Sequence, residues 1–418
     1  MAVQQTLTVI PPNASLNGKV TPPGSKSITN RALLLAALAK GTSRLSGALK
    51  SDDTRHMSNA LRQMGVTISE PDDTTFVVTG SGQLQVPEQP LFLGNAGTAV
   101  RFLTAAVSTV NGTVVLDGDH YMQKRPIGPL LDALRRAGLD VESATGCPPV
   151  TVRGQGRVQA RRFEIDGGLS SQYVSALLML AACGEEPVEV ALTGKDIGAR
   201  GYVDLTLACM RAFGAQVEAV DETTWRVAAT GYRACDYQVE PDASAATYLW
   251  AAEVLTAGRI DLGVAGEDFT QPDAKALDVI QQFPYMPAVI NGSQMQDAIP
   301  TLAVLAAFNR TPVRFVELAN LRVKECDRVQ ALHDGLNEIR AGLAAVEGDD
   351  LLVASDPALA GTSCNALIDT HSDHRIAMCF ALAGLKVSGI RIQDPDCVAK
   401  TYPDYWKALA SLGVQYAS

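Results

Sequence analysis

The chain lacks the features that would place it in a membrane or outside the cell. No apolar run in its 418 residues approaches the roughly 18 residues that a membrane-spanning helix needs. Its first residues, MAVQQTLTVIPPNAS, contain no charged segment followed by an apolar stretch, so we expect no secretory signal. The eight cysteines are scattered and form no CxxC pair, which is typical of reduced thiols rather than of a disulfide framework or a zinc site. We therefore expect a cytoplasmic protein that does not bind a membrane.

Positive charge is also scarce, since the formal net charge is -10. Proteins that bind DNA or RNA are usually basic, so we expect no nucleic acid partner. An acidic chain can still bind anions if its cations are gathered in one place. The remaining composition, 47% hydrophobic and 19% charged, is that of a globular protein long enough for two or three domains.

One pattern recurs along the chain. A polar loop rich in Gly, Ser, Asn or Asp leads into a helix crowded with Ala and Leu, and a turn and a β-branched strand usually follow. The copies begin near Ser25, Asn95, Ser170, Ser244, Asp297 and Asp373. Helices that are apolar on every side are buried, so the pattern predicts an α/β fold with helices inside and sheets outside. Two sets of three copies would form two similar lobes, with the seam near residue 240.

The polar helix starts contain candidate anion-binding residues. In PPGSKSITNR (22–31), Ser25 is a candidate N-cap, and Ser27 and Arg31 are four residues apart on one helix face. A cation such as Lys26, hydroxyl groups and a helix N-terminus together form an anion site. The alternative is a capped helix with solvated charges. Weaker signals of the same kind are LFLGNAGTAVRF (91–102), MQKRPIGP (122–129) and SSQY (170–173).

Acidic side chains accompany the cations in the second half of the chain. In NLRVKECDR (320–328), one helical turn would contain Lys324, Glu325 and Arg328, although a salt-bridged surface would look the same. Asp297 begins an almost wholly apolar helix, where it is either an N-cap or a candidate base. SDHRIAM (372–378) begins another such helix, and its HxxH spacing does not by itself predict a metal site.

Eight motifs occur in the order seen in EPSP synthases, which are 3-phosphoshikimate 1-carboxyvinyltransferases. They are PGSKSITNR, GNAGTAVRF, KRPIG, SSQY, DASAATY, NLRVKECDR, SDHRIAM and CVAKTYPDYW, from residue 23 to residue 406. The resemblance implies the two-lobed enolpyruvyl transferase fold, in which each lobe has three βαβαββ repeats with helices inside and sheets outside. One lobe would contain residues 1–23 and 241–418, the other residues 24–240, and the substrates would bind in the cleft.

The resemblance also implies the activity. The enolpyruvyl group of phosphoenolpyruvate would be transferred to the 5-hydroxyl of shikimate 3-phosphate, a step of aromatic amino-acid biosynthesis in the shikimate pathway. Neither a metal nor an organic cofactor is implied. We expect glyphosate to inhibit the enzyme and the chain to act as a monomer.

Site residues follow from the matching motif positions. The residues expected to hold shikimate 3-phosphate are Lys26, Ser27, Arg31, Ser170, Ser171, Gln172, Tyr202, Asp297, Asn320 and Lys324. Those expected to hold phosphoenolpyruvate are Lys26, Asn95, Gly97, Arg125, Gln172, Arg328, His374, Arg375 and Lys400. Asp297, Glu325 and Lys26 would carry out the acid–base chemistry. The two substrates together carry two phosphates and two carboxylates, a charge of roughly -5 to -6. The arginines and lysines of this set would balance that charge.

The sequence departs from the family pattern at three positions. Ala199 stands where a serine often contacts the substrate phosphate, Cys326 where Ser or Thr is usual, and Phe102 where many bacterial members have proline. These changes leave every proposed catalytic group in place, so they concern substrate and inhibitor affinity.

Two other functions would use the same scaffold. An enolpyruvyl transferase acting on UDP-N-acetylglucosamine typically uses a cysteine in a loop of the first lobe, whereas the loop at 118–125 has none and the first cysteine is Cys147. A non-catalytic protein on the same scaffold would normally have lost Asp297, Glu325 or a substrate lysine, and all are present.

Overall fold

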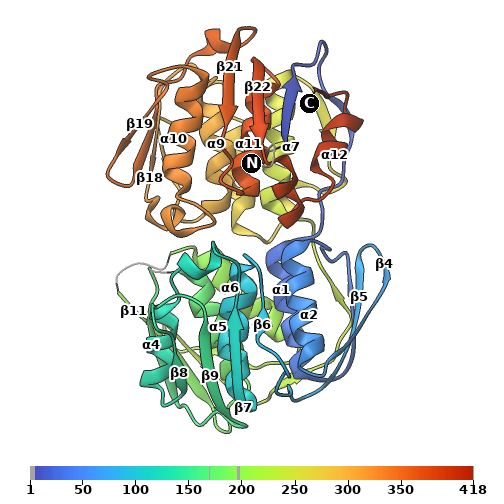
Figure 1. The fold of residues 1–418 in the computed structure, drawn as a ribbon, viewed down its shortest axis with the longest axis vertical. Coiled ribbons are helices and arrows are strands. Elements are labelled where there is room, and N and C mark those ends of the chain that lie inside the picture. The colour runs from blue at the N-terminus through green and yellow to red at the C-terminus, as the bar shows by residue number, and fades with distance from the viewer. Residues whose placement is uncertain (1–4, 169, 195–197, 418) are drawn as a thin grey trace. The chain divides into compact units, whose positions relative to one another are not determined.

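The chain folds into two compact units (Figure 1). The computed structural model describes residues 5–168, 170–194 and 198–417. Contacts define a discontinuous unit, Met1–Pro23 with Pro241–Ser418, and a continuous unit, Gly24–Glu240. None of the described helices is both long and apolar enough to cross a membrane.

The described residues of the continuous unit form three mixed sheets. The first has the order β14 (Tyr232–Arg233), β3 (Ala39–Ser46), β5 (Thr75–Ser81), β4 (Thr67–Asp72), with β15 (Tyr237–Gln238) also paired to β3. The second is β6 (Leu91–Phe92), β7 (Asn111–Asp117), β9 (Val150–Gln155), β8 (Asp140–Glu142). The third is β10 (Arg162–Asp166), β11 (Val188–Thr193), β13 (Thr224–Val227), β12 (Val217–Ala219). Each begins with a parallel pair and continues with antiparallel pairs.

The helices of this unit differ in burial as their sequences predict. They are α1 (Lys26–Leu38), α2 (Asp52–Gln63), α3 (Gly97–Ala106), α4 (Gly128–Arg136), α5 (Ser171–Ala181) and α6 (Arg200–Ala212). Every residue of α3 is buried, as is every residue of α1 except Ser27. The Ala-rich and Leu-rich composition of α1, α3 and α5 allows burial on all sides, whereas α2 and α4 have a polar face. The prediction that the apolar helices are buried is confirmed here.

In the discontinuous unit, the N-terminal strand pairs with strands from the C-terminal part of the chain. β1 (Thr6–Ile10) lies between β22 (Ser388–Gln393) and β23 (Gln415–Ala417), and β21 (Ser363–Ile368) completes this sheet. Leu7 pairs with Ile392 and Val9 with Tyr416. The two ends of the chain therefore share one sheet, which explains why residues far apart in sequence form one unit.

Two further sheets and six helices lie among the described residues of the discontinuous unit. The sheets are β2 (Asn17–Lys19) with β16 (Arg259–Asp261), and β17 (Val289–Asn291), β18 (Val313–Val316), β20 (Asp350–Val353), β19 (Ala344–Glu347) in that order. The helices are α7 (Ala243–Thr256), α8 (Ala276–Ile280), α9 (Ile299–Ala306), α10 (Arg328–Ile339), α11 (His374–Gly384) and α12 (Tyr405–Ser411). Short 3-10 turns carry several polar residues: η4 (Pro272–Lys275), η5 (Gln296–Ala298), η6 (Ala319–Val323) and η8 (Pro395–Lys400).

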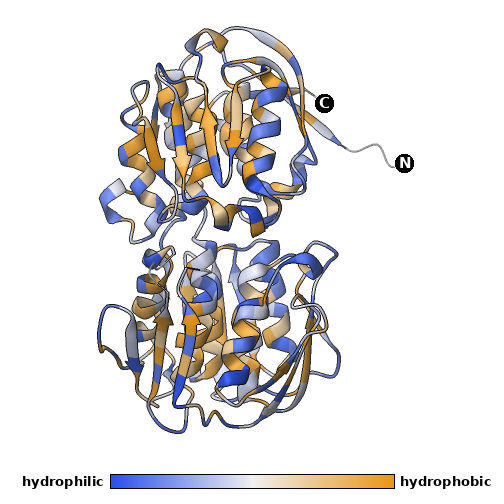
Figure 2. Cartoon of the chain, turned by 90° about the vertical axis from the view of Figure 1, so that its left-hand side faces the viewer, coloured by the Kyte–Doolittle hydropathy of each residue, from blue (hydrophilic) through white to orange (hydrophobic). Residues whose placement is uncertain are grey.

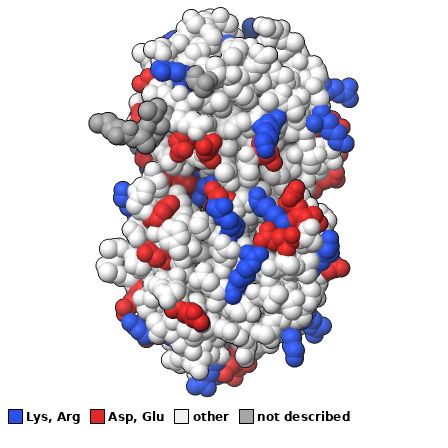
Figure 3. All heavy atoms as spheres, turned by 45° about the vertical axis from the view of Figure 1, so that its right-hand side comes forward, with Lys and Arg blue, Asp and Glu red and all other residues white. Residues whose placement is uncertain are grey.

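Each unit has its own apolar core. In the discontinuous unit α7, α9 and α11 are the most apolar helices, and all residues of α9 and α11 are buried. Hydrophobic and hydrophilic residues alternate along many helices and strands of each unit, and hydrophilic residues are also frequent in the loops (Figure 2). On the face shown in Figure 3, basic and acidic side chains are interspersed.

Candidate active site

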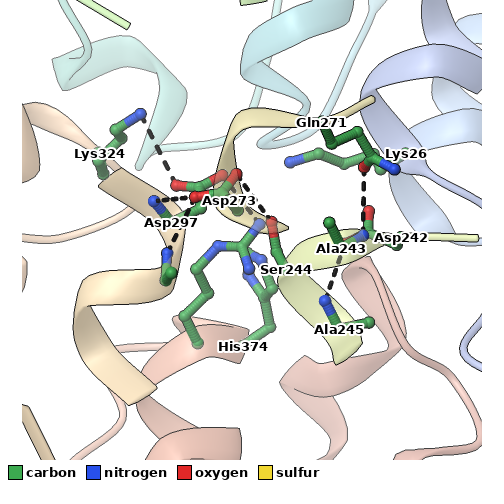
Figure 4. Close-up of polar contacts among 12 residues, drawn as sticks. Lys26, Asp242, Ala243, Ser244, Ala245, Gln271, Asp273, Asp297, Lys324 and His374 are labelled. Carbon is green, nitrogen blue, oxygen red and sulfur yellow. Dashed lines mark hydrogen bonds and ion pairs between the residues drawn. The ribbon is translucent and has the colours of Figure 1, made fainter. Parts of the chain in front are cut away.

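Asp297 is paired with three cations in the discontinuous unit. Its Oδ1 accepts a hydrogen bond from Arg328 Nη1 at 3.0 Å and its Oδ2 one from Arg375 Nη2 at 2.9 Å. The Nζ atom of Lys324 lies 3.9 Å from Oδ1 (Figure 4). The Asp297 side chain is 15% exposed. It is therefore an accessible carboxylate fixed by arginines from two different helices.

Arg328 bonds to two further carboxylates besides Asp297, those of Asp373 and Glu325. Its side chain is 1% exposed, and its Nε and Nη2 atoms donate to Asp373 at 2.7 and 3.3 Å. Nη2 also donates to Glu325 Oε2 at 2.6 Å. Burial alone would lower the pKa of Arg328, but Asp373, Glu325 and Asp297 outweigh it and raise that pKa above its usual range. The guanidinium is therefore a permanent cation with a fixed orientation.

Glu325 lies between two cations. Besides its bond to Arg328, its Oε1 is 3.7 Å from Lys400 Nζ, at the end of η8. Both side chains of the Glu325–Lys400 pair are largely buried. A carboxyl group in such a position can exchange a proton with a bound ligand while the cations hold that ligand's negative charge.

The start of α11 fixes the second arginine. Asp373 caps this helix by accepting a hydrogen bond from the Arg375 backbone N–H at 2.9 Å. Burial lowers the pKa of Arg375, but Asp297 and Tyr248 lead the groups that raise it well above its usual value. His374 is fully buried, and its Nδ1 is 3.6 Å from Asp373 Oδ1. The structure thus brings together Asp297, Lys324, Glu325, Arg328, His374, Arg375 and Lys400, all expected from the sequence, while Asn320 lies in the adjoining η6.

In the continuous unit, Lys26 is the first residue of α1. Ser25 caps the helix through its side chain, as the sequence predicts, accepting from Ile28 N at 3.4 Å. The Nζ atom of Lys26 lies 3.6 Å from Asp53 Oδ2, and both side chains are largely buried. Lys26 is therefore a cation held at a helix N-terminus, where anions are favoured.

The guanidinium of Arg31 is buried among α1, α5 and α6. The residue is 2% exposed, and its Nε donates to Thr206 Oγ1 at 2.7 Å while Nη2 donates to Ser175 Oγ at 3.1 Å. Its Nη1 bonds to the Ser27 carbonyl at 2.8 Å, and its Cζ lies 5.0 Å from the Phe102 ring centroid. Burial lowers the pKa of Arg31, against smaller opposing contributions from Cys209, Tyr202 and Tyr237. The guanidinium therefore bonds to groups of α1, α5 and α6 inside the unit.

A second group of expected residues meets at the start of α3. Arg125 Nη1 donates to the Asn95 side-chain oxygen at 2.9 Å and to the Asn95 carbonyl at 3.2 Å. A Cβ atom on Gly97 would lie 2.7 Å from Arg125 Nη2, so only glycine allows this approach. Arg101 of α3 donates to Gln172 Oε1 at 3.1 Å, which holds the Gln172 amide near the start of α3.

The start of α5 and the start of α6 complete the expected residues. Ser170 caps α5 by accepting from the Gln172 backbone N–H at 3.3 Å, and Ser171 is the first helical residue. Tyr202 lies in the first turn of α6, where its carbonyl accepts from Thr206 Oγ1 at 2.8 Å. Ala199, at the N-cap of α6, has a left-handed backbone with φ of 53°.

Several residues of these clusters were not expected from the sequence. They are Asp53, Arg101 and Asp273, together with the role of Asp373 as a partner of Arg328. Asp373 was expected only as a polar helix start, and an Asp directly before an apolar helix also predicts an N-cap. Asp273 gives no such signal, since it reaches the start of α9 from a separate 3-10 turn. Among the described residues, no group of three or more His, Cys, Asp or Glu side chains is arranged to hold a metal ion.

Comparison with known proteins shows what this chain is similar to. The profile of the EPSP synthase (3-phosphoshikimate 1-carboxyvinyltransferase) family matches residues 10–409. A 3-phosphoshikimate 1-carboxyvinyltransferase of Pseudomonas savastanoi pv. phaseolicola is 72% identical over 415 residues, 99% of each chain. That of Rhizobium etli is 70% identical over 410 residues, 98% of each chain.

Solved structures give the same result for the fold. The EPSP synthase of Acinetobacter baumannii superposes with a TM-score of 0.78 at 26% identity, covering 99% of this chain and all of that one. The mixed α/β fold is therefore that of EPSP synthase structures, and the resemblance inferred from the eight motifs is confirmed. The chain belongs to the EPSP synthase family of enolpyruvyl transferases.

Proposed function

We propose that this chain transfers the enolpyruvyl group of phosphoenolpyruvate to the 5-hydroxyl of shikimate 3-phosphate, giving 5-enolpyruvylshikimate 3-phosphate and phosphate, with Asp297 and Glu325 as its acid–base pair. The overall activity is that of a 3-phosphoshikimate 1-carboxyvinyltransferase, as in relatives 72% identical along the whole chain. The observation that supports the residue roles is the cluster in which Arg328 binds both Asp297 and Glu325.

Phosphoenolpyruvate would bind the cations of this cluster. Arg328 and Arg375 now share one carboxylate, that of Asp297. The carboxylate of phosphoenolpyruvate offers the same bidentate chemistry and would replace Asp297 on these arginines. The exchange would release Asp297 from two of its cations, which makes it a stronger base when the substrate arrives. The other proposed ligands are Lys26, Asn95, Gly97, Arg125, Gln172, His374 and Lys400.

Shikimate 3-phosphate would bind residues at the helix starts. The proposed ligands are Lys26, Ser27, Arg31, Ser170, Ser171, Gln172, Tyr202, Asp297, Asn320 and Lys324. The guanidinium of Arg31 is oriented by its bonds to Thr206 and Ser175. It also donates to the Ser27 carbonyl, so Arg31 would fix the α1 turn that carries Ser27 as well as supply a cation.

The chemistry would be addition followed by elimination. Asp297 accepts the proton of the shikimate 5-hydroxyl, and Glu325, with Lys26 assisting, gives a proton to the methylene carbon of phosphoenolpyruvate. The hydroxyl oxygen adds to the cationic carbon and forms a tetrahedral adduct. The C–O bond to phosphate then breaks and the new methyl group loses a proton, which restores the carbon–carbon double bond. The arginines and lysines hold the departing phosphate, so the protein supplies position and charge stabilisation.

We also propose that each unit is one lobe of three βαβαββ repeats. The element order supports this, because β6, α3, β7, α4, β8 and β9 follow that pattern, as do β10, α5, β11, α6, β12 and β13. The chain would act as a monomer, with glyphosate as an inhibitor competing with phosphoenolpyruvate.

Phosphate release from phosphoenolpyruvate tests the function. We expect release with shikimate 3-phosphate and none above background with UDP-N-acetylglucosamine. Asp297→Asn should lose turnover, whereas Asp334→Asn, the same change on the exposed surface of α10, should keep it. Release with the UDP-sugar alone would overturn the substrate assignment, and full turnover in Asp297→Asn would overturn the assigned base.

A further inference from the structure

We propose that Asp273 is a positioning residue that holds the proposed base Asp297 in place. Asp273 lies in η4 and is completely buried. Its Oδ1 accepts hydrogen bonds from the backbone N–H groups of Asp297 and Ala298, both at 3.1 Å (Figure 4). These groups lie in η5, which leads directly into α9.

The first N–H groups of a helix have no partner within the helix. An aspartate at such a start usually satisfies them with its own side chain. Here no side chain of η5 or α9 caps the turn, since Asp273 supplies the acceptor from another segment. The Asp297 carboxylate is therefore available to Arg328 and Arg375 instead of being used as a cap.

Asp273 is itself held by α7. Its Oδ2 accepts from Ser244 Oγ at 3.2 Å, and Ser244 is buried near the start of that helix. Gln271, just before η4, donates to the Pro241 carbonyl at 2.7 Å and accepts from Ala243 N at 3.3 Å. The segment that carries Asp273 is thus anchored to α7, and through it the start of α9 is anchored too.

A buried carboxylate suits this task better than a neutral group. Hydrogen bonds from N–H groups to an ionised acceptor are roughly twice as strong as neutral ones. A negative charge at a helix start is also favoured by the helix dipole. Without Asp273, the backbone N–H groups of Asp297 and Ala298 lose this acceptor, and we expect the turn that carries Asp297 to relax.

A double-mutant cycle separates positioning from a general structural role. We expect Asp273→Ala to lower kcat by about 100-fold, the cost of misplacing a reacting group by roughly 1 Å. In an Asp297→Ala background the same change should lower kcat by no more than about twofold, because no base remains to be positioned. Asp273→Asn, whose amide oxygen can still accept both N–H groups but carries no negative charge, should recover only part of the kcat that Asp273→Ala loses.

The outcomes are distinct. An equal loss of kcat from Asp273→Ala in both backgrounds, or a folded Asp273→Ala with the parent's kcat, would overturn the positioning role. The inference rests on the proposed role of Asp297, so the parent's turnover in Asp297→Ala alone would overturn both. If Asp273→Ala does not fold, Ser244→Ala serves in the same cycle, with an expected loss of about threefold to tenfold. Additive losses for that variant would overturn the proposal.

Discussion

Replacing Gly97 by alanine should disturb the proposed phosphoenolpyruvate site through Arg125. The added Cβ would lie 2.5 Å from Arg101 Nη1 and 2.7 Å from Arg125 Nη2. Carbon needs about 3.5 Å from a neighbouring heavy atom, so both guanidinium groups must move by roughly 0.8–1 Å. Both are ends of flexible side chains, so the protein should still fold and the effect should appear in function.

The size of the effect follows from that shift. Misplacing a binding group by 1 Å can cost about 100-fold, so we expect the KM for phosphoenolpyruvate to rise at least about tenfold. Glyphosate is longer than phosphoenolpyruvate and would fill the space beside Gly97 more fully. Its inhibition constant should therefore rise by a larger factor than the KM.

Steady-state kinetics with a matched control check this prediction. Gly97 and Gly128 are each the first residue of a helix, α3 and α4. A Cβ on Gly128 would meet nothing nearer than 3.8 Å, so Gly128→Ala should change both constants by less than about twofold. If Gly97→Ala has the same KM and the same inhibition constant as the parent, the reasoning is refuted, because Arg125 would then have no role near this glycine.

Two further predictions concern buried arginines and are checked by urea unfolding. Thr206→Val should lower the free energy of unfolding by about 1–3 kcal/mol, because the Arg31 Nε–H loses its buried acceptor; an unchanged value would mean that another group replaces the threonine. Arg328→Met should cost at least about 3 kcal/mol, because three carboxylates lose their buried partner. Arg153→Met, which breaks exposed pairs, should cost much less than Arg328→Met, and equal losses for the two would contradict the account.

Much of the fold could be predicted because burial leaves a clear pattern in the sequence. Helices α1, α3 and α11 are apolar on every side, and the structure buries them. Their polar starts were visible as caps and glycine turns. Asp297 lies in η5, directly before α9, and Arg375 lies in the first turn of α11. The resemblance carried by the separate motifs assigned both residues, with Arg328, to one site, and the structure places them in contact.

Two features of the site could not be read from the sequence. The orientation of Arg31 was hidden because i,i+4 spacing identifies a shared helix face but not whether that face meets solvent. In a helix buried on every side, the guanidinium found acceptors on α5 and α6. The role of Asp273 was hidden because its contacts join segments that only tertiary packing brings together.

Solvent deuterium tests the central claim, that Glu325 protonates the methylene carbon of phosphoenolpyruvate. In heavy water the carbon would gain a deuteron and the resulting methyl group would lose one hydrogen, so the product should carry deuterium in its enolpyruvyl methylene. Glu325→Gln should bind both substrates and form product at least about 100-fold more slowly. If the addition step reverses, phosphoenolpyruvate recovered from the parent's reaction also carries deuterium, and the variant should incorporate this deuterium more slowly by the same factor. Product without deuterium from the parent, or turnover within a few-fold of the parent in Glu325→Gln, would contradict the account.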